Sequence, residues 1–108
     1  MITKWFHQIL DRFFLRKFMI VKGDSLPTQM PFRTIVLAIE EDETWCIGLK
    51  CPCGCGFTIE LPTIIEAKPR WTYQIDIQQN ISVYPSVHLQ KRCKSHFWIK
   101  QGKIIWCH

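Results

Sequence analysis

The residues best suited to chemistry lie in one short loop at positions 51–56, where three cysteines alternate with proline and glycine in the order CPCGCG. A fourth cysteine, Cys93, lies far along the chain. Structural zinc sites are held by about four ligands in a tetrahedron, most often thiolates. Thiolates crowded into one loop repel one another unless a cation lies between them, and glycine gives such a loop the backbone freedom to wrap around an ion. The sequence therefore predicts a Zn²⁺ site formed by Cys51, Cys53, Cys55 and Cys93.

The alternative is that these cysteines are buried thiols or disulfides. A disulfide between cysteines two positions apart is strained, because the bond has narrow geometric limits. The chain has six cysteines, and three of them fall in this loop rather than being spread along the chain. This uneven spacing favours a metal site in a reducing cytoplasm over a secreted disulfide framework. Cys46 is expected to be a small core residue.

A second group of residues could form a nucleophile–base pair. A hydroxyl nucleophile needs a base within hydrogen-bond reach, and a neutral imidazole is available near pH 7. Zinc held by four thiolates has no open position, so catalysis would have to lie beside the metal. His96 is the candidate base. Ser95 and His96 would point to opposite faces of a strand, so Ser86 meets His96 more easily and Ser95 is the reserve nucleophile. Asp76 or Glu60 could orient the imidazole, and the spacing selects neither.

These polar residues also have structural interpretations. Ser86 follows a proline and could be an ordinary turn residue. Ser95 could hydrogen-bond the thiolates from outside the metal's ligand set, and His96 could replace one cysteine as a ligand. The residues alone leave both interpretations open.

The elements that would position these groups begin with an amphipathic helix at residues 3–22. Its apolar residues, from Trp5 to Met19, recur at i, i+1, i+4 and i+5 and give one wide apolar face. Three roles are open for this helix: packing on the domain's own sheet, docking to a partner protein, or lying on a membrane surface. The segment has neither the length of a membrane span nor the cleavage site of a signal peptide.

The rest of the chain indicates strands. We expect a fold that is mainly β (α+β): a small antiparallel β domain pinned by a zinc knuckle, with one N-terminal helix. The expected division is a helix at 1–23, a linker at 24–31 and a zinc-binding β domain at 32–108. The expected strands are 32–39, 44–49, 57–61, 71–77, 81–84, 96–100 and 103–106, with an acidic turn at 40–43 and Pro85-Ser86 closing the strand before it.

Length and charge limit the functional classes. A chain of 108 residues is enough for one domain, and a domain this small often depends on a metal or a disulfide. The net charge is +5, but basic residues gather in the first 22 positions and the C-terminal third, whereas 40–43 is acidic. The basic residues make no continuous stripe, which argues against nucleic-acid binding and favours contact with a protein.

Taken together, the motifs resemble a small bacterial family that is found in ubiquitination-like operons beside E1-like, E2-like and ubiquitin-like proteins. The resemblance covers roughly residues 33–107. The residues that carry it are CPCGCG at 51–56, Trp71, Pro85-Ser86-Val87 and the run CKSHFWI at 93–99. The chain departs from the family pattern at Leu49, where members often have His, and at residues 88–90, where members often have Gly-Asn-Trp and this chain has His-Leu-Gln.

The resemblance implies a serine-type, deubiquitinase-like peptidase with a structural zinc ion. It places the metal on the four cysteines named above, and it covers Ser86, Ser95 and His96. It implies a ubiquitin-like protein and E1- and E2-like proteins as partners, in the cytoplasm and in a setting such as antiphage defence. The rival hypothesis is a non-catalytic zinc module that binds a protein of the same conjugation or defence operon.

Overall fold

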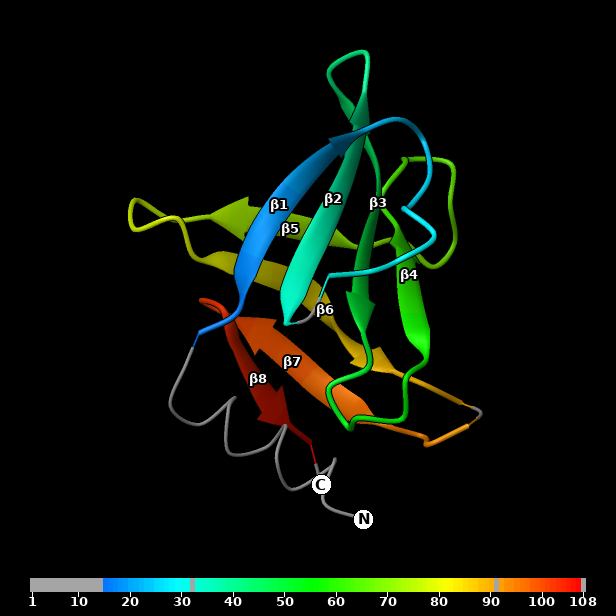
Figure 1. Cartoon of the computed structure of the whole chain (residues 1–108), viewed down its shortest axis with the longest axis vertical. Coiled ribbons are helices and arrows are strands. Elements are labelled where there is room, and N and C mark those ends of the chain that lie inside the picture. The colour runs from blue at the N-terminus through cyan, green and yellow to red at the C-terminus, as the bar shows by residue number, and fades with distance from the viewer. Residues whose placement is uncertain (1–14, 32, 91, 108) are drawn as a thin grey trace.

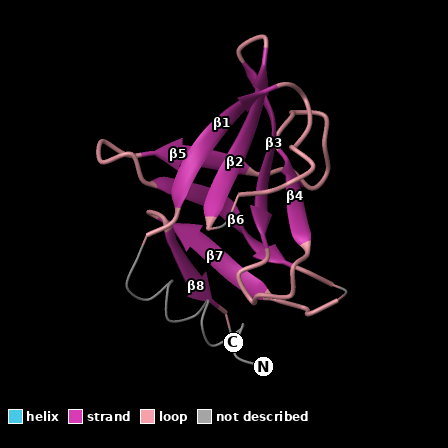
Figure 2. Ribbon diagram, in the orientation of Figure 1, coloured by secondary structure: helices cyan, strands magenta, loops and turns pink. Residues whose placement is uncertain are grey.

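The computed structural model describes residues 15–31, 33–90 and 92–107, which form strands and loops without a helix (Figures 1 and 2). The mainly-β prediction is confirmed for these residues. They include no helix that is long and apolar enough to cross a membrane. The strands are β1 (Lys17–Lys22), β2 (Thr34–Glu40), β3 (Glu43–Lys50), β4 (Thr58–Pro62), β5 (Thr72–Ile75), β6 (Ile81–His88), β7 (His96–Lys100) and β8 (Lys103–Trp106).

The strands make two four-stranded sheets that follow the chain order, β1-β2-β3-β4 and β5-β6-β7-β8. Neighbouring strands are antiparallel, except that β1 pairs with β2 in parallel. In Figure 1 the first sheet lies in front of the second, and its strands run across those behind it. Each sheet buries one face against the other, as expected for a β-sandwich.

The core lies between these two inner faces and follows the alternation of the strands. Phe97 on β7 is fully buried, whereas its neighbours His96 and Trp98 are only half-buried, because successive side chains of a strand point to opposite faces. The core residues are Ile35, Leu37, Ile47, Leu49, Ile59 and Leu61 from the first sheet and Ile81, Val83, Val87, Phe97, Ile99 and Ile104 from the second.

Two tight hairpins connect neighbouring strands. Glu41 and Asp42 link β2 to β3 with φ angles of 52° and 64°, and Gln101 and Gly102 link β7 to β8 with φ angles of 51° and 79°. Two central residues with positive φ are characteristic of the hairpin turn whose twist matches that of the flanking strands. The turn predicted within the acidic block 40–43 is confirmed, as is the last hairpin.

The predicted N-terminal helix is wrong where the structure describes it. Residues 17–22 form strand β1, which pairs with β2 from Lys17↔Thr34 to Lys22↔Ile39. Phe18 packs against the core, whereas Met19 and Ile20 are exposed, so the apolar run has no helical face. The backbone N–H and C=O groups along the edge of β2 pair with those of residues 17–22. This pairing between two strands outweighs the local preference of the apolar pattern for a helix. The earlier part of the predicted helix lies outside the described residues.

Two strand boundaries also differ from the prediction. Strand β5 stops at Ile75, because Asp76 Oδ1 accepts hydrogen bonds from the backbone N–H groups of Gln78 and Asn80, each at 2.9 Å, and so closes a turn. Ile77 therefore lies outside the predicted apolar face and is 96% exposed. Strand β6 does not end at Pro85-Ser86 but continues to His88.

Gly102 lies in the hairpin between β7 and β8, close to the backbone of Arg16. Its φ is positive, and a Cβ added there would lie 3.0 Å from the Arg16 carbonyl oxygen. We expect Gly102→Ala to lower the free energy of unfolding by about 1 kcal/mol or more, because the alanine would be strained and crowded. The measurement is the midpoint of urea unfolding. Lys103→Ala, an exposed change in the same hairpin, should shift it little, and an equal midpoint for both variants would contradict this account.

Candidate metal centre and serine–histidine pair

The cysteine loop joins β3 to β4 and is folded tightly on itself. The Cys51 N–H donates to the Phe57 carbonyl oxygen at 2.8 Å, and the Gly54 N–H donates to the Cys51 carbonyl oxygen at 3.1 Å. Gly54 and Gly56 have φ angles of 90° and 88°, which L-residues rarely adopt. The glycines therefore let the backbone turn between successive cysteines, as expected from the sequence.

The four predicted cysteines meet in space. All four sulfur atoms, from Cys51, Cys53, Cys55 and Cys93, lie within 4.8 Å of one another. Cys93 is delivered by the loop between β6 and β7. Measured sulfur–sulfur distances are 3.4 Å for Cys51–Cys53, 3.5 Å for Cys51–Cys93 and 3.9 Å for Cys55–Cys93, and all four thiols are free.

These distances suit a shared ion. Sulfurs at about 2.3 Å from a tetrahedral Zn²⁺ lie about 3.8 Å apart, whereas a disulfide requires about 2.05 Å. The cluster can therefore hold one metal ion without rearrangement of the loop. The group that can hold a metal consists of the four cysteines, so the alternative in which His96 replaces one of them receives no support.

The pKa values of the cysteine thiols shift in different directions, because their surroundings differ. Burial raises the pKa of the Cys51 thiol above its ordinary value, so a thiolate there needs a cation beside it. Burial also opposes ionisation of Cys93, but hydrogen bonds from the side chain and backbone of Ser95 and from neighbouring thiols outweigh it and lower the pKa of Cys93 to about 6. Cys46 stays a thiol, because burial, together with the charge of Glu60, raises its pKa to about 11.

Ser95 links the cluster to the start of β7. Its buried hydroxyl oxygen lies 3.0 Å from Cys93 Sγ and 3.6 Å from Cys51 Sγ. The interpretation of Ser95 as a hydrogen-bonding partner of the cluster thus fits the geometry. The hydroxyl of Ser95, the reserve nucleophile, lies against the sulfur atoms and not against the His96 imidazole. His96, the next residue, points to the other face of the sheet.

That other face carries the serine–histidine pair. Ser86 Oγ lies 3.1 Å from His96 Nε2, within the distance at which an imidazole can accept a hydroxyl proton. The pairing of β6 with β7 shifts between Val83 and Val87, so β6 holds extra residues there that bulge from the ladder, and Ser86 lies at this irregularity. The Trp71 indole N–H donates to the Ser86 carbonyl oxygen at 3.4 Å and holds the bulge from β5's side.

Sequence reasoning missed one member of this group. The imidazole of His88 stacks on that of His96, with ring centroids 4.3 Å apart and an angle of 13° between the ring planes. Gln90 Nε2 lies 3.4 Å from His88 Nδ1. The signal was the spacing of Ser86 and His88, since residues two apart on a strand share a face. It was hidden because β6 was expected to end at Ser86.

The two carboxylates considered as orienting groups lie elsewhere. Asp76 closes the turn after β5 through the backbone N–H groups described above. Glu60 is exposed on β4 beside Cys46, on the face of the first sheet that points away from the core. Within the described ranges, His96 makes no hydrogen bond to a carboxylate, and its ring contacts Ser86 and His88.

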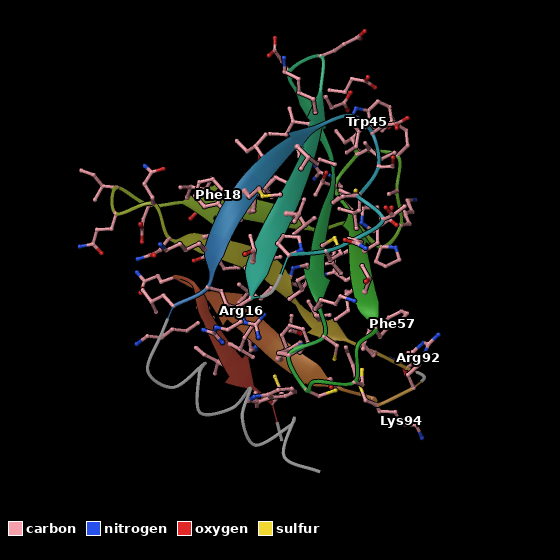
Figure 3. The ribbon with its side chains drawn as sticks, in the orientation of Figure 1. Arg16, Phe18, Trp45, Phe57, Arg92 and Lys94 are labelled. Atoms are coloured by element: carbon pink, nitrogen blue, oxygen red, sulfur yellow. The ribbon has the colours of Figure 1, made fainter. Side chains whose placement is uncertain are left out.

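Two clefts extend from this region. One, of about 360 Å³, is lined by Phe57, Leu89, Gln90 and Arg92 beside the cysteine loop. The Arg92 guanidinium lies 4.4 Å from the centre of the Phe57 ring, and Figure 3 shows these two side chains together at the edge of the molecule, with Lys94 below them. The other cleft, of about 600 Å³, lies further along β6 and β7 and includes Tyr84 and Lys100.

Comparisons with known proteins agree with this geometry. Searches of curated proteins and of solved structures returned no match. The model of the family described as bacterial ubiquitination-like system serine protease (BubE) matches residues 22–107, which include the cysteine cluster and the Ser86–His96 pair. The chain therefore belongs to the BubE family of serine proteases of bacterial ubiquitination-like systems.

Proposed function

We propose that this protein is a serine peptidase that processes or removes a ubiquitin-like protein, with Ser86 as nucleophile and His96 as base. The observation that carries the proposal is the distance of 3.1 Å between Ser86 Oγ and His96 Nε2, at a bulge in β6. The family description, a serine protease of a ubiquitination-like system, supports the same reaction class and the same setting.

The reaction would follow the general scheme of acyl transfer to a serine. Ser86 Oγ gives its proton to His96 Nε2 and forms a bond to the carbonyl carbon of the scissile amide. The C–N bond then breaks, and the leaving amine takes the proton from His96, which leaves an ester on Ser86. Water adds to that ester while His96 takes one of its protons. The Ser86–acyl bond then breaks as His96 returns that proton to Ser86 Oγ, which restores both groups, and the released acid loses a proton to solvent to become a carboxylate.

Zinc is the proposed occupant of the cluster, because four thiolates at tetrahedral spacing are the donor set that structural zinc sites use. Bound there, it supplies a cross-link between two distant segments and keeps the thiolates ionised. Cys51, Cys53 and Cys55 hold one side and Cys93 the other, which fixes the start of β7. Since Ser95 touches the sulfurs and His96 follows it directly, this cross-link determines where the imidazole lies.

The proposed substrate is a ubiquitin-like protein or its conjugate, and E1- and E2-like proteins are the proposed functional partners, in the cytoplasm. Gln90 lines the cleft beside the cysteine loop and also contacts His88, which stacks on His96. The surface of this cleft consists mostly of apolar atoms. An extended peptide approaching Ser86 could place an apolar side chain there, with Arg92 close to any neighbouring carboxylate.

The catalytic assignment is tested with two readouts: cleavage of a ubiquitin-like precursor, and covalent labelling of the full chain by a fluorophosphonate, mapped by mass spectrometry. We expect the label on Ser86, loss of both readouts in Ser86→Ala, and a decrease of about 10²–10⁴-fold in His96→Ala, because the base is removed. Ser25→Ala, an exposed serine in the loop after β1, should behave as the wild type.

Full cleavage by Ser86→Ala and His96→Ala would eliminate this assignment. A chain that binds its ubiquitin-like partner tightly, yet shows neither label nor cleavage, would instead indicate the non-catalytic interaction module.

The metal assignment is tested by native mass spectrometry and by unfolding. We expect one zinc ion per chain, lost in Cys93→Ser together with more than about 2 kcal/mol of the free energy of unfolding, because binding to the folded state alone stabilises it. Cys107→Ser changes a half-buried thiol outside the cluster and is the matched control, which should keep the ion. A wild-type chain that is free of metal and still unfolds at the same urea midpoint after chelation would contradict the proposal.

A further inference from the structure

Among the described residues, His88 is a titratable side chain that contacts the serine–histidine pair and has no part in the reaction described above. We propose that His88 is a positioning residue for His96: its ring, which Gln90 contacts at Nδ1, stacks on the His96 imidazole, keeps Nε2 aimed at Ser86 and stabilises the imidazolium that forms when Ser86 loses its proton. This inference rests on the proposed peptidase function.

The first support is the strand register. His88 and His96 are directly opposite each other in the antiparallel pair β6–β7. Side chains at directly opposite positions share a face and lie close enough to interact. The two imidazole rings are stacked face to face, with an angle of 13° between their planes and 4.3 Å between their centroids. A parallel face contact of this kind prevents the His96 ring from tilting out of the plane in which Nε2 meets Ser86 Oγ.

The second support is that, among the described residues, no carboxylate orients the His96 imidazole. In serine–histidine sites a carboxylate commonly holds the imidazole from its other edge. Among the described residues, Asp76 is engaged in the turn after β5 and Glu60 lies on the opposite outer face of the molecule, beside Cys46. A stacked ring can hold the orientation of the imidazole instead, and it leaves the nitrogen atoms at the ring edge free for proton transfer.

The third support concerns charge. Gln90 Nε2 lies 3.4 Å from His88 Nδ1, at the edge of the stacked ring. Two stacked imidazolium rings would repel each other, whereas a neutral aromatic ring stabilises a cation over its face. The contact with Gln90 helps to hold the His88 ring in the stack, where its face lies against the His96 imidazole as that ring gains a positive charge during the reaction.

The experiment compares His88→Leu with His88→Phe in the full chain. Leucine keeps much of the volume but has no π face, whereas phenylalanine keeps a flat neutral ring. The probe is the fluorophosphonate, and the readout is the rate at which Ser86 is labelled. We expect His88→Leu to lower that rate by about three- to tenfold, as for loss of one aromatic pair, and His88→Phe to remain within about twofold of the wild type.

Gln90→Ala should also slow labelling, and Gln78→Ala, an exposed glutamine in the turn after β5, is its matched control and should not. Urea midpoints accompany each rate, so that a general loss of stability is not mistaken for loss of orientation. The stack itself is read by NMR: the ring protons of His96 should move downfield in His88→Leu and stay upfield in His88→Phe.

The failure of this inference differs from failure of the proposed function. Equal labelling rates in the wild type and His88→Leu, with Ser86→Ala unlabelled, would overturn the role of His88 alone. Equal losses in His88→Leu and His88→Phe would also overturn it, since the ring would then act through its nitrogens. A wild-type chain that the probe does not label at Ser86 would overturn the proposed function, and the role of His88 in that reaction with it.

Discussion

Four sulfur atoms from two segments far apart in the chain meet within 4.8 Å, and Ser95, beside the serine–histidine pair, contacts two of them. The loop after β3 contributes three sulfurs, and the loop before β7 contributes the fourth. Closing such a long connection costs the unfolded chain conformational freedom, and an ion that binds only the folded cluster makes the closure favourable. A sandwich with a core this small gains much from one such cross-link.

The cluster and the serine–histidine pair are adjacent in the fold. Ser95 faces the sulfurs and His96 faces Ser86, because adjacent residues at the start of a strand point to opposite sides of the sheet. The cysteine cluster and the serine–histidine pair therefore lie on opposite sides of the start of β7. In the proposed site, an ion in the cluster would fix the start of β7, whose register places the imidazole directly across from His88 and near Ser86. Such a metal would take no part in the chemistry and would still be required for it.

The pair differs from the common serine–histidine–carboxylate arrangement in what holds the imidazole. The His88 ring stacks on its face, which in our proposal restrains its tilt and stabilises its charged form, and does not accept a hydrogen bond from the other ring nitrogen. Orientation by stacking needs an aromatic side chain directly across the ladder, which is the position His88 occupies. The continuation of β6 beyond Pro85-Ser86 is what brings this residue into the site.

The sequence by itself determined the cysteine cluster, most of the strands and the meeting of Ser86 with His96. These features depend on local chemistry: thiolates at alternate positions require a cation, β-branched runs alternate between core and solvent, and two neighbours on a strand face opposite ways. Tertiary structure decided the rest. Residues 17–22 are a strand because the edge of β2 offers backbone partners, although the apolar pattern continues that of a helix. His88 joins the site because of a bulge that shifts the register between Val83 and Val87, and a register is a property of two paired strands that neither sequence segment carries alone.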